Sequence, residues 1–402
     1  MPLNSEQING LKEALGRWVE EAIPSQAGLG EALIYGKKLT IYHGVDPTAP
    51  DLHLGHSTNY FLLRRLQKLG HRIILLIGDF TARIGDPSGR TIERTPLTEK
   101  QVTENAKTYK KQVAKILDFD SAQNPVSLAH NSKWLGKLAL NDIIDISSRF
   151  TVQQMLARDM FQKRIKDGNP IGLHEFLYPL MQGYDSVALK TDVEVGGSDQ
   201  LFNMLVGRDL VKKYLAKEKF VITTKLLVNP KTGVKLMSKS EGNYIALNDL
   251  PDKMYGKVMA LPDEVINDCF ELCTEVPMGE IAEIIKTPPR EAKARLAREI
   301  VEIYHGKSAA ESSQREFERV FTSHEAPQNI EEIKLSEKNL NIVDLLVKIG
   351  FASSKNEARR LIEQGGVRVG GAIIKDWNGT VKIEDKMIVQ VGKRRFARLA
   401  LH

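Results

Sequence analysis

The stretch LTIYHGVDPTAPDLHLGH, residues 39–56, decides the fold. Its first part, LTIYHG (39–44), has the β-branched and aromatic residues of a strand, and the turn-forming VDPTAPDL follows directly. A helix is then predicted to begin near His53 and to run towards Leu69. A strand that leads through a turn into a helix is the repeating unit of an α/β domain with a parallel sheet.

The same alternation continues through the first half of the chain. RIILLIG (72–78) is a near-continuous apolar run, typical of a strand buried on both faces of a sheet. Residues 126–129 and 191–195 are further candidate strands. Thr98 and Gln101 have the spacing of a capping box, which predicts a long helix from there to about Leu117.

The length of 402 residues favours two or three domains over a single core. We predict an α/β nucleotide-binding domain with a Rossmann-like parallel sheet over 1–260 and a helical domain over 261–323. Residues 324–341 are polar and are predicted to form a linker. A small α+β module is predicted over 342–402.

The composition, 42% hydrophobic and 27% charged residues, is that of a globular protein. No run approaches the ~18 apolar residues of a membrane span. The N-terminal 22 residues predict an amphipathic helix rather than a secretory signal, so we expect a cytoplasmic protein. Cys269 and Cys273 are too few for a four-ligand zinc site, and no protein-bound metal is predicted.

The positive charge is concentrated at the C-terminal end. Residues 341–402 hold 12 Lys+Arg and 6 Asp+Glu, which accounts for the whole net charge of +6. A neutral body with a basic end suggests that the end meets a polyanion. A merely solvated basic surface is the alternative.

Two familiar phosphate motifs, GxxxxGK[ST] and GxGxxG after a strand, do not occur. HLGH (53–56) offers another way to hold a nucleotide, because its two histidines lie three apart at a helix start, where backbone N–H groups are exposed. Gly55 leaves room for a nucleotide against the backbone. A chance match or a metal pair is the alternative for this motif alone.

A lysine-bearing segment, KLMSKS (235–240), follows a glycine-containing loop. Such a loop can close over a triphosphate and neutralise charge as pyrophosphate leaves. Taken alone, a loop with two lysines is usually solvated surface. Consecutive side chains of an extended loop point to opposite sides, which favours Lys239 over Lys235 as the phosphate ligand.

These two motifs resemble the signatures of class I aminoacyl-tRNA synthetases. YHGVDPT (42–48), GDPSG (85–89) and GGSDQ (196–200), with Tyr178, Gln182 and Asp185 spaced i, i+4, i+7, occur in the order found in bacterial tyrosyl-tRNA synthetases. The resemblance covers essentially the whole chain. It implies activation of L-tyrosine with ATP, transfer to tRNA(Tyr), a homodimer with residues 131–151 near its interface, and Mg²⁺ carried by ATP.

The resemblance also implies roles for individual residues. In the tyrosine pocket, Tyr42 and Asp185 would bind the phenol, and three residues would bind the ammonium: Asp86, Tyr178 and Gln182. Gln200 would meet the carboxylate. Thr48 and His53 would lie on the γ-phosphate side of ATP, and the ribose and adenine side would have Gly55, His56 and Asp199. The phosphates would be clamped by Arg90, Arg94 and Lys239, with Lys235 and Met237 in the same loop.

Residues 351–371 resemble a small RNA-binding module shared with a small-subunit ribosomal protein. Its predicted RNA-binding residues are Lys355, Arg359, Arg360, Arg368, Lys393, Arg394 and Arg395. Contacts of this kind with RNA phosphates would be salt-sensitive and would mostly position the RNA.

The sequence departs from the family pattern at His43, where relatives often have a small residue, at Arg90, and at Leu236, which replaces the first lysine of KMSKS. A tryptophanyl-tRNA synthetase is one alternative, although it would not require the Tyr42 and Asp185 pair. A non-catalytic RNA-binding paralogue is the other, and both histidines together with Lys239 argue against it.

Overall fold

The computed structural model describes residues 3–88, 96–237, 244–321, 331–392 and 395–401. The chain divides into two compact units, residues 1–307 and residues 308–402. Each unit is described separately below.

Six strands among the described residues of the first unit form one sheet, in the order β1-β6-β5-β2-β3-β4. The strands are β1 (Val19–Ile23), β2 (Thr40–Val45), β3 (Arg72–Ile77), β4 (Ser127–His130), β5 (Val193–Gly197) and β6 (Phe220–Thr224). β1 is antiparallel to β6, and the other neighbours are parallel. The four predicted strands are therefore confirmed as β2 to β5, whereas β1 and β6 were not predicted.

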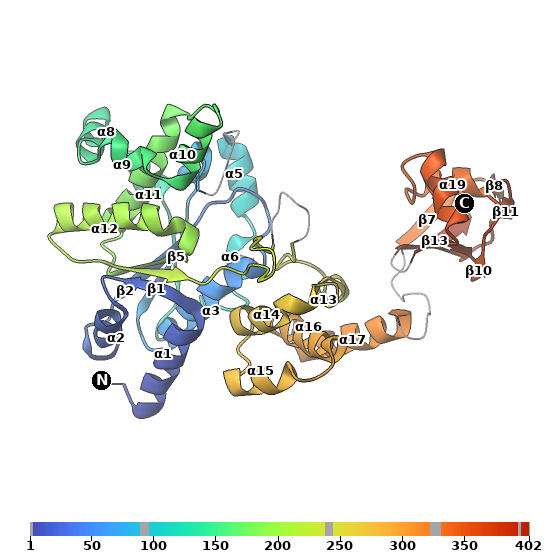
Figure 1. The fold of residues 1–402 in the computed structure, drawn as a ribbon, viewed down its shortest axis with the longest axis horizontal. Coiled ribbons are helices and arrows are strands. Elements are labelled where there is room, and N and C mark those ends of the chain that lie inside the picture. The colour runs from blue at the N-terminus through green and yellow to red at the C-terminus, as the bar shows by residue number, and fades with distance from the viewer. Residues whose placement is uncertain (1–2, 89–95, 238–243, 322–330, 393–394, 402) are drawn as a thin grey trace. The chain divides into compact units, whose positions relative to one another are not determined.

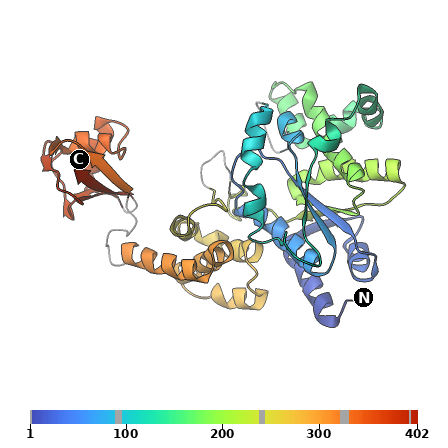
Figure 2. The ribbon, with the colours of Figure 1, turned by 180° about the vertical axis from the view of Figure 1, so that it is seen from behind.

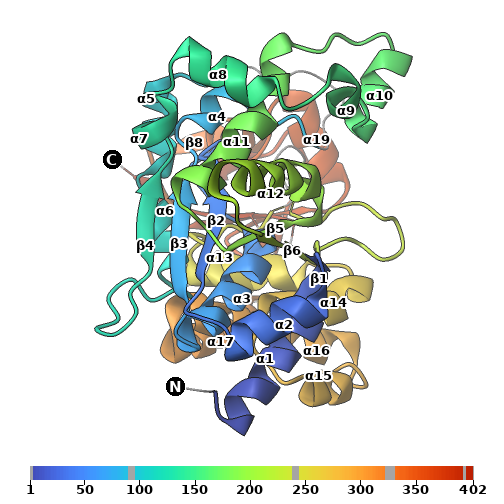
Figure 3. The same cartoon turned by 90° about the vertical axis from the view of Figure 1, so that its left-hand side faces the viewer.

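Helices cover both faces of this sheet (Figures 1 and 3). α11 (Leu177–Ala188) and α12 (Leu201–Leu215) pack against each other on one face, and α1 (Ser5–Trp18) and α3 (Ser57–Lys68) lie on the other. Residues 73–77 of β3 are each at most 3% exposed because both faces of the strand are covered. This double burial explains why the strand is apolar without alternation.

Two helix predictions need correction. The N-terminal helix ends at Trp18, and the next residues form the edge strand β1 instead of continuing to Ala22. The capping box of Thr98 is confirmed, but the helix it opens ends early and gives α5 (Glu99–Ala106) and α6 (Tyr109–Val113). The break lets the Thr108 and Tyr109 hydroxyls donate to the carbonyls of Pro50 and Ala49, at 3.2 and 2.6 Å.

The other elements of the α/β part are short. They are α2 (Gln26–Tyr35), η1 (Leu54–His56), α4 (Thr81–Ile84), α7 (Ser132–Leu135), α8 (Leu140–Ser147), α9 (Val152–Leu156), α10 (Asp159–Lys166), η2 (Leu173–Phe176) and η3 (Ser198–Gln200). The helix predicted from His53 to Leu69 thus begins as the 3-10 turn η1 and continues as α3.

A group of helices follows the sheet. It comprises α13 (Pro251–Met259), η5 (Asp263–Val265), α14 (Ile266–Cys273), α15 (Met278–Ile284) and α16 (Pro289–His305). α14 packs against α1 and α3 (Figure 2), and the buried Arg17 guanidinium donates to the carbonyls of Phe270 and Thr274 at 2.9 and 2.8 Å. These hydrogen bonds satisfy carbonyls at the C-terminal end of α14 and fix this helix to α1.

The second unit contains most of α17 (Lys307–Phe321) and a small α+β module. In the module, α18 (Ile342–Lys348) and α19 (Lys355–Glu363) pack with strands in the order β10-β9-β12-β13-β7, and β8 pairs with β11. The strands are β7 (Glu331–Leu335), β8 (Asn339–Asn341), β9 (Val367–Val369), β10 (Ala372–Ile373), β11 (Thr380–Lys382), β12 (Ile388–Val391) and β13 (Arg395–Leu401). Because β7 pairs with β13, the described part of the predicted linker belongs to this module.

Candidate active site

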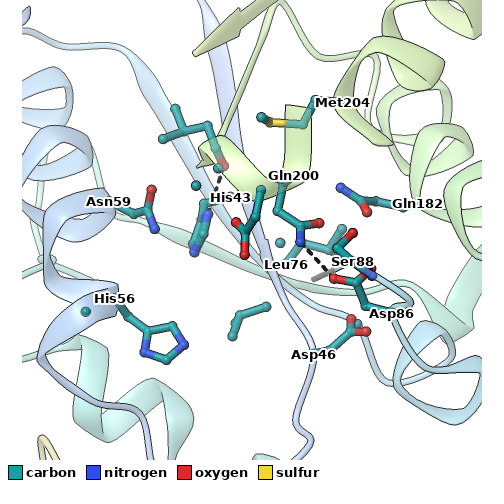
Figure 4. Close-up of a pocket in the computed structure, with 18 of the residues that line it drawn as sticks. His43, Asp46, His56, Asn59, Leu76, Asp86, Ser88, Gln182, Gln200 and Met204 are labelled. Atoms are coloured by element: carbon teal, nitrogen blue, oxygen red, sulfur yellow. Dashed lines mark hydrogen bonds between the residues drawn. The ribbon is translucent and has the colours of Figure 1, made fainter. Parts of the chain in front are cut away.

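A cavity of about 460 Å³ opens at the carboxyl ends of β2, β3 and β5, where ligands bind in open α/β sheets (Figure 4). Most of the predicted site residues line it: Tyr42, Thr48, His53, Gly55, His56, Asp86, Tyr178, Gln182, Asp185, Asp199, Gln200, Lys235 and Met237. Arg90, Arg94 and Lys239 lie outside the described residues. The sheet therefore gathers in one place residues that are spread over almost 200 positions of sequence.

Asp185 forms the deep polar end of the cavity together with Tyr42. Its carboxylate accepts from the Trp134 indole N–H at 2.7 Å and from the Asn131 amide at 3.1 Å. Burial raises the pKa of Asp185 well above its usual range, and burial likewise raises the pKa of Tyr42. Neither Asn131 nor Trp134 could be recognised as a pocket residue from the sequence, because neither lies in one of the ordered motifs.

A second polar group of the cavity is built around Asp86. Its carboxylate accepts from the Gln200 side-chain amide at 2.7 Å, a contact drawn in Figure 4. The Tyr178 hydroxyl instead donates to Asp46 at 3.0 Å. Gln182 Oε1 is buried and has no hydrogen-bond partner among the described residues. The three residues predicted to bind an ammonium thus all line the cavity, with an acceptor available on Gln182.

The two histidines of HLGH lie side by side at the start of α3. Their ring centroids are 4.0 Å apart, and His56 Nδ1 lies 3.1 Å from the carbonyl oxygen of His53. His56 is the N-cap of the 12-residue α3. A Cβ on Gly55 would lie 3.1 Å from the His53 ring, so this position is close-packed. The two imidazoles therefore lie close together beside the N-terminus of α3, as the spacing of HLGH predicts.

The lysine-bearing segment contributes three consecutive residues to the cavity wall, Lys235, Leu236 and Met237. Lys235 Nζ lies 2.9 Å from the Asp199 carboxylate, with half of the lysine side chain exposed. The backbone at Met237 has a φ of 65°, so the segment is not regularly extended. Strict alternation does not hold over these three residues, because all of them line the cavity. Lys239 lies outside the described residues, so the choice between Lys235 and Lys239 stays a prediction.

Arg158 is a cation near the cavity that the sequence did not single out. It is buried, stacks on Phe202 at 4.7 Å and donates to the Ser88 hydroxyl at 2.8 Å. Burial lowers its pKa to about 10. Because Asp86 and Ser88 share one turn, Arg158 fixes the turn that presents Asp86 to the cavity.

His43, one of the departures from the family pattern, lies on β2 at the cavity wall (Figure 4). Its Nδ1 lies 2.8 Å from the Val195 carbonyl, and Nε2 has no partner among the described residues. Burial lowers the pKa of His43. A neutral imidazole whose Nδ1–H donates to Val195 leaves Nε2 as an acceptor that faces the cavity.

Beneath Tyr42 lies a buried charge pair that the sequence did not reveal. Glu194 on β5 and Lys219, the residue before β6, are 2% and 0% exposed and form an ion pair. Ser186 on α11 connects this pair to Tyr42. The available signal was a glutamate within the otherwise apolar stretch 193–197, which a buried strand accepts only with a partner.

The comparisons with known proteins agree with this geometry. Residues 35–322 match the family described as class I tRNA synthetases (W and Y), and residues 341–386 match the S4 domain. The chain belongs to this class I synthetase family. The resemblance found in the sequence is thereby confirmed, as is the α/β fold with its small RNA-binding module.

The relatives of this synthetase chain match most of its length. It is 46% identical over 394 residues to the tyrosine–tRNA ligase of Moorella thermoacetica, which covers 96% of this chain and 94% of that protein. It is 47% identical over 369 residues to that of Thermotoga maritima, with 90% of each chain covered. The solved structure of a truncated mitochondrial tyrosyl-tRNA synthetase from Aspergillus nidulans has a TM-score of 0.66 at 26% identity and covers 79% of this chain and 95% of that one.

The predicted RNA-binding residues of the S4 domain lie on an exposed surface. Lys355 pairs with Asp344 at 2.6 Å, and the Arg359 guanidinium stacks on Trp377 at 4.5 Å. Arg360 and Arg368 are also exposed, as is Arg395, whose guanidinium donates to the Phe351 carbonyl at 2.6 Å. Lys393 and Arg394 lie outside the described residues.

Two further properties concern only the described residues. None of their helices has the length and apolar character needed to cross a membrane. They also contain no group of three or more His, Cys, Asp or Glu side chains placed to hold a metal ion.

Proposed function

We propose that this synthetase is a tyrosine–tRNA ligase, which forms tyrosyl-adenylate from L-tyrosine and ATP and transfers the tyrosine to tRNA(Tyr). The curated relatives that match over nearly the whole chain carry that name. The observation that carries the proposal is the buried hydroxyl and carboxylate of Tyr42 and Asp185 at the deep end of the cavity. A phenol can donate to one of these groups and accept from the other.

The rest of the cavity suits the amino-acid part of tyrosine. Asp86, Tyr178 and Gln182 supply a carboxylate, a hydroxyl and an amide oxygen for the α-ammonium, and Gln200 lies beside Asp86 on the side assigned to the carboxylate. An indole N–H could donate to Asp185 but could not accept from Tyr42. The tyrosine assignment is therefore favoured over tryptophan.

ATP is assigned to the mouth of the same cavity. Thr48 and His53 are assigned to the γ-phosphate side, and Gly55, His56 and Asp199 to the ribose and adenine. The positive end of the α3 dipole favours an anion there. Arg90, Arg94 and Lys239 are proposed to clamp the phosphates, with Lys235 and Met237 on the wall. Mg²⁺ enters as part of the ATP substrate, where it neutralises phosphate charge.

The reaction requires positioning and charge stabilisation rather than a covalent enzyme intermediate. A tyrosine carboxylate oxygen forms a bond to the α-phosphorus, the bridging P–O bond breaks, and pyrophosphate leaves in line. The histidines and cations donate to the charge that grows on the phosphate oxygens. A hydroxyl at the 3′ end of tRNA then attacks the carbonyl carbon of the adenylate and releases AMP.

The division of the chain follows these tasks. We assign activation to residues 1–260, support of the tRNA to the helices of 261–323, and RNA binding to the S4 domain. We also propose a cytoplasmic homodimer. Large apolar side chains support the dimer, since Leu140, Ile144 and Val152 of α8 and α9 are 74%, 56% and 65% exposed.

The test is ATP–pyrophosphate exchange with each of the twenty amino acids. Tyrosine alone should support fast exchange, and phenylalanine should be rejected because it leaves buried polar groups unpaired. Fast exchange with tryptophan would favour the related specificity, and no exchange with any amino acid would favour a non-catalytic paralogue.

A further inference from the structure

Four side chains meet next to the tyrosine pocket, from Tyr42 of β2, Ser186 of α11, Glu194 of β5 and Lys219, the residue before β6. Lys219 donates to Ser186 Oγ at 2.8 Å and to Glu194 Oε2. Ser186 Oγ in turn lies 2.9 Å from the hydroxyl of Tyr42 and 3.2 Å from Glu194 Oε2. Glu194 also accepts from the Gln182 amide at 3.2 Å.

The Lys219 ammonium fixes the direction of its own hydrogen bond to Ser186, and this limits what the Ser186 hydroxyl can do. An ammonium can only donate, so Ser186 Oγ accepts from Lys219 and keeps its single proton for another acceptor. Two acceptors compete for that proton, Tyr42 Oη and Glu194 Oε2, and Tyr42 is the closer. When Ser186 donates to Tyr42, the Tyr42 hydroxyl proton is free to point into the pocket.

The second branch fixes Gln182. An ionised carboxylate can only accept, so the amide nitrogen of Gln182 must face Glu194. Its Oε1 then points away from Glu194, and this buried oxygen has no hydrogen-bond partner among the described residues. An unpaired acceptor at this position suits a cationic donor such as the α-ammonium of an amino acid.

We infer that the Glu194–Lys219 pair is a positioning device that makes Tyr42 a hydrogen-bond donor to the substrate phenol and Gln182 an acceptor for its ammonium. This inference rests on the proposed tyrosine specificity and extends it. Asp185, which already accepts from two N–H groups, then also accepts the hydrogen bond that the phenol hydroxyl donates. The substrate hydroxyl thus makes two hydrogen bonds: it donates to Asp185 and accepts from Tyr42.

Removing the Ser186 hydroxyl distinguishes the two possible directions of the Ser186–Tyr42 hydrogen bond, because each direction predicts a different change in selectivity. In Ser186→Ala, the donor to Tyr42 is lost, so the ratio of kcat/KM for tyrosine to that for phenylalanine should fall about three- to tenfold. The kcat/KM for phenylalanine, which has no hydroxyl, should be unchanged. If Tyr42 instead donates to Ser186, the alanine frees that proton for the substrate, and the ratio should stay the same or rise.

The double variant Glu194→Gln/Lys219→Met removes both charges without leaving either unpaired. Its ratio should also fall, and kcat/KM for both amino acids should drop because Gln182 loses its orientation. The matched control is Lys225→Met/Glu271→Gln, which removes a pair of 2.7 Å outside the cavity and should keep the wild-type ratio.

Circular dichroism shows whether each variant is folded, and the double variant decides if Ser186→Ala does not fold. A wild-type ratio in a folded double variant overturns the inference. Failure of the wild-type protein to exchange pyrophosphate with tyrosine would instead overturn the proposed function.

Discussion

Asp185→Asn changes one oxygen of the buried carboxylate to an amide nitrogen and keeps its size. Asparagine can accept from only one of the two N–H groups that contact Asp185, from Trp134 at 2.7 Å or from Asn131 at 3.1 Å. Asn131 also donates to Thr81 at 2.9 Å, so the amide oxygen should turn towards Trp134. The carboxylate, which is a charged acceptor only above the raised folded-state pKa of Asp185, is then lost to the substrate phenol.

The size of the effect follows from that lost acceptor. A hydrogen bond to a charged group contributes about 1.5–3 kcal/mol, which corresponds to about a 10- to 150-fold loss of kcat/KM for tyrosine. The KM for ATP should not change. Pyrophosphate exchange at several tyrosine concentrations measures the loss, with Asp192→Asn as the control, because Asp192 binds the Thr40 N–H at 2.7 Å outside the cavity. An Asp185→Asn enzyme that activates tyrosine as fast as the wild type would refute the phenol-binding role.

The same substitution has a predictable effect on stability. Burial, with Glu194 and Asp46 nearby, raises the folded-state pKa of Asp185 well above its usual range. Its contribution to stability is full below the unfolded pKa of about 4 and is lost as the pH rises through the folded pKa. Asparagine does not ionise and has no such loss. The free energy of unfolding of the variant should therefore increase relative to that of the wild type as the pH rises from about 5 to about 8. Urea unfolding at both pH values checks this sign, and a difference that does not change with pH would contradict it.

Substituting His53 or His56 by alanine should slow adenylate formation by about 10²–10³ and leave the fold intact, because each removes a donor to the transition state; full pyrophosphate exchange in the double variant would exclude this role. Ending the chain near Ala326 should preserve adenylate synthesis and reduce tRNA charging, most visibly at moderate salt, and unchanged tRNA affinity would contradict the RNA-binding role of the S4 domain. Lys239→Ala should slow adenylate formation more than Lys235→Ala, with little effect of either on tyrosine binding. If presteady-state assays show that the two variants form adenylate at equal, reduced rates, then both lysines reach the phosphates.

Much of the fold was predictable because its signals are local. The strands β2 and β3 follow from apolar and β-branched runs, and the capping box at Thr98 marks the start of α5. The edge strand β1 was missed because VEEAI continues the charged pattern of the preceding helix, and its pairing with β6 joins residues about 200 positions apart. Such pairing depends on tertiary contacts rather than on local propensity.

The candidate site was predictable where residues face the substrate and obscure where they act through other residues. Tyr42 and Asp185 lie in ordered motifs, so the resemblance placed them in one pocket, and the cavity contains both. Trp134 and Lys219 lie outside those motifs, and their importance comes from hydrogen bonds to pocket residues. The loop of Lys235 was assumed to be extended, but its backbone has a positive φ at Met237, a local feature that residue types alone did not reveal.

The position of Gly207 shows that the network below Tyr42 was built at a cost in stability. Glycine in the middle of a helix such as α12 is less favourable than alanine by about 1 kcal/mol. A Cβ at this position would lie 2.7 Å from Lys219 Nζ and 2.9 Å from Ser186 Oγ, so any other residue would displace the ammonium or the hydroxyl. A buried ion pair is itself often less stabilising than apolar residues of similar volume. Gly207 and the buried pair together keep Lys219 beside Ser186, where the direction of the Ser186 hydrogen bond would determine how Tyr42 meets its substrate.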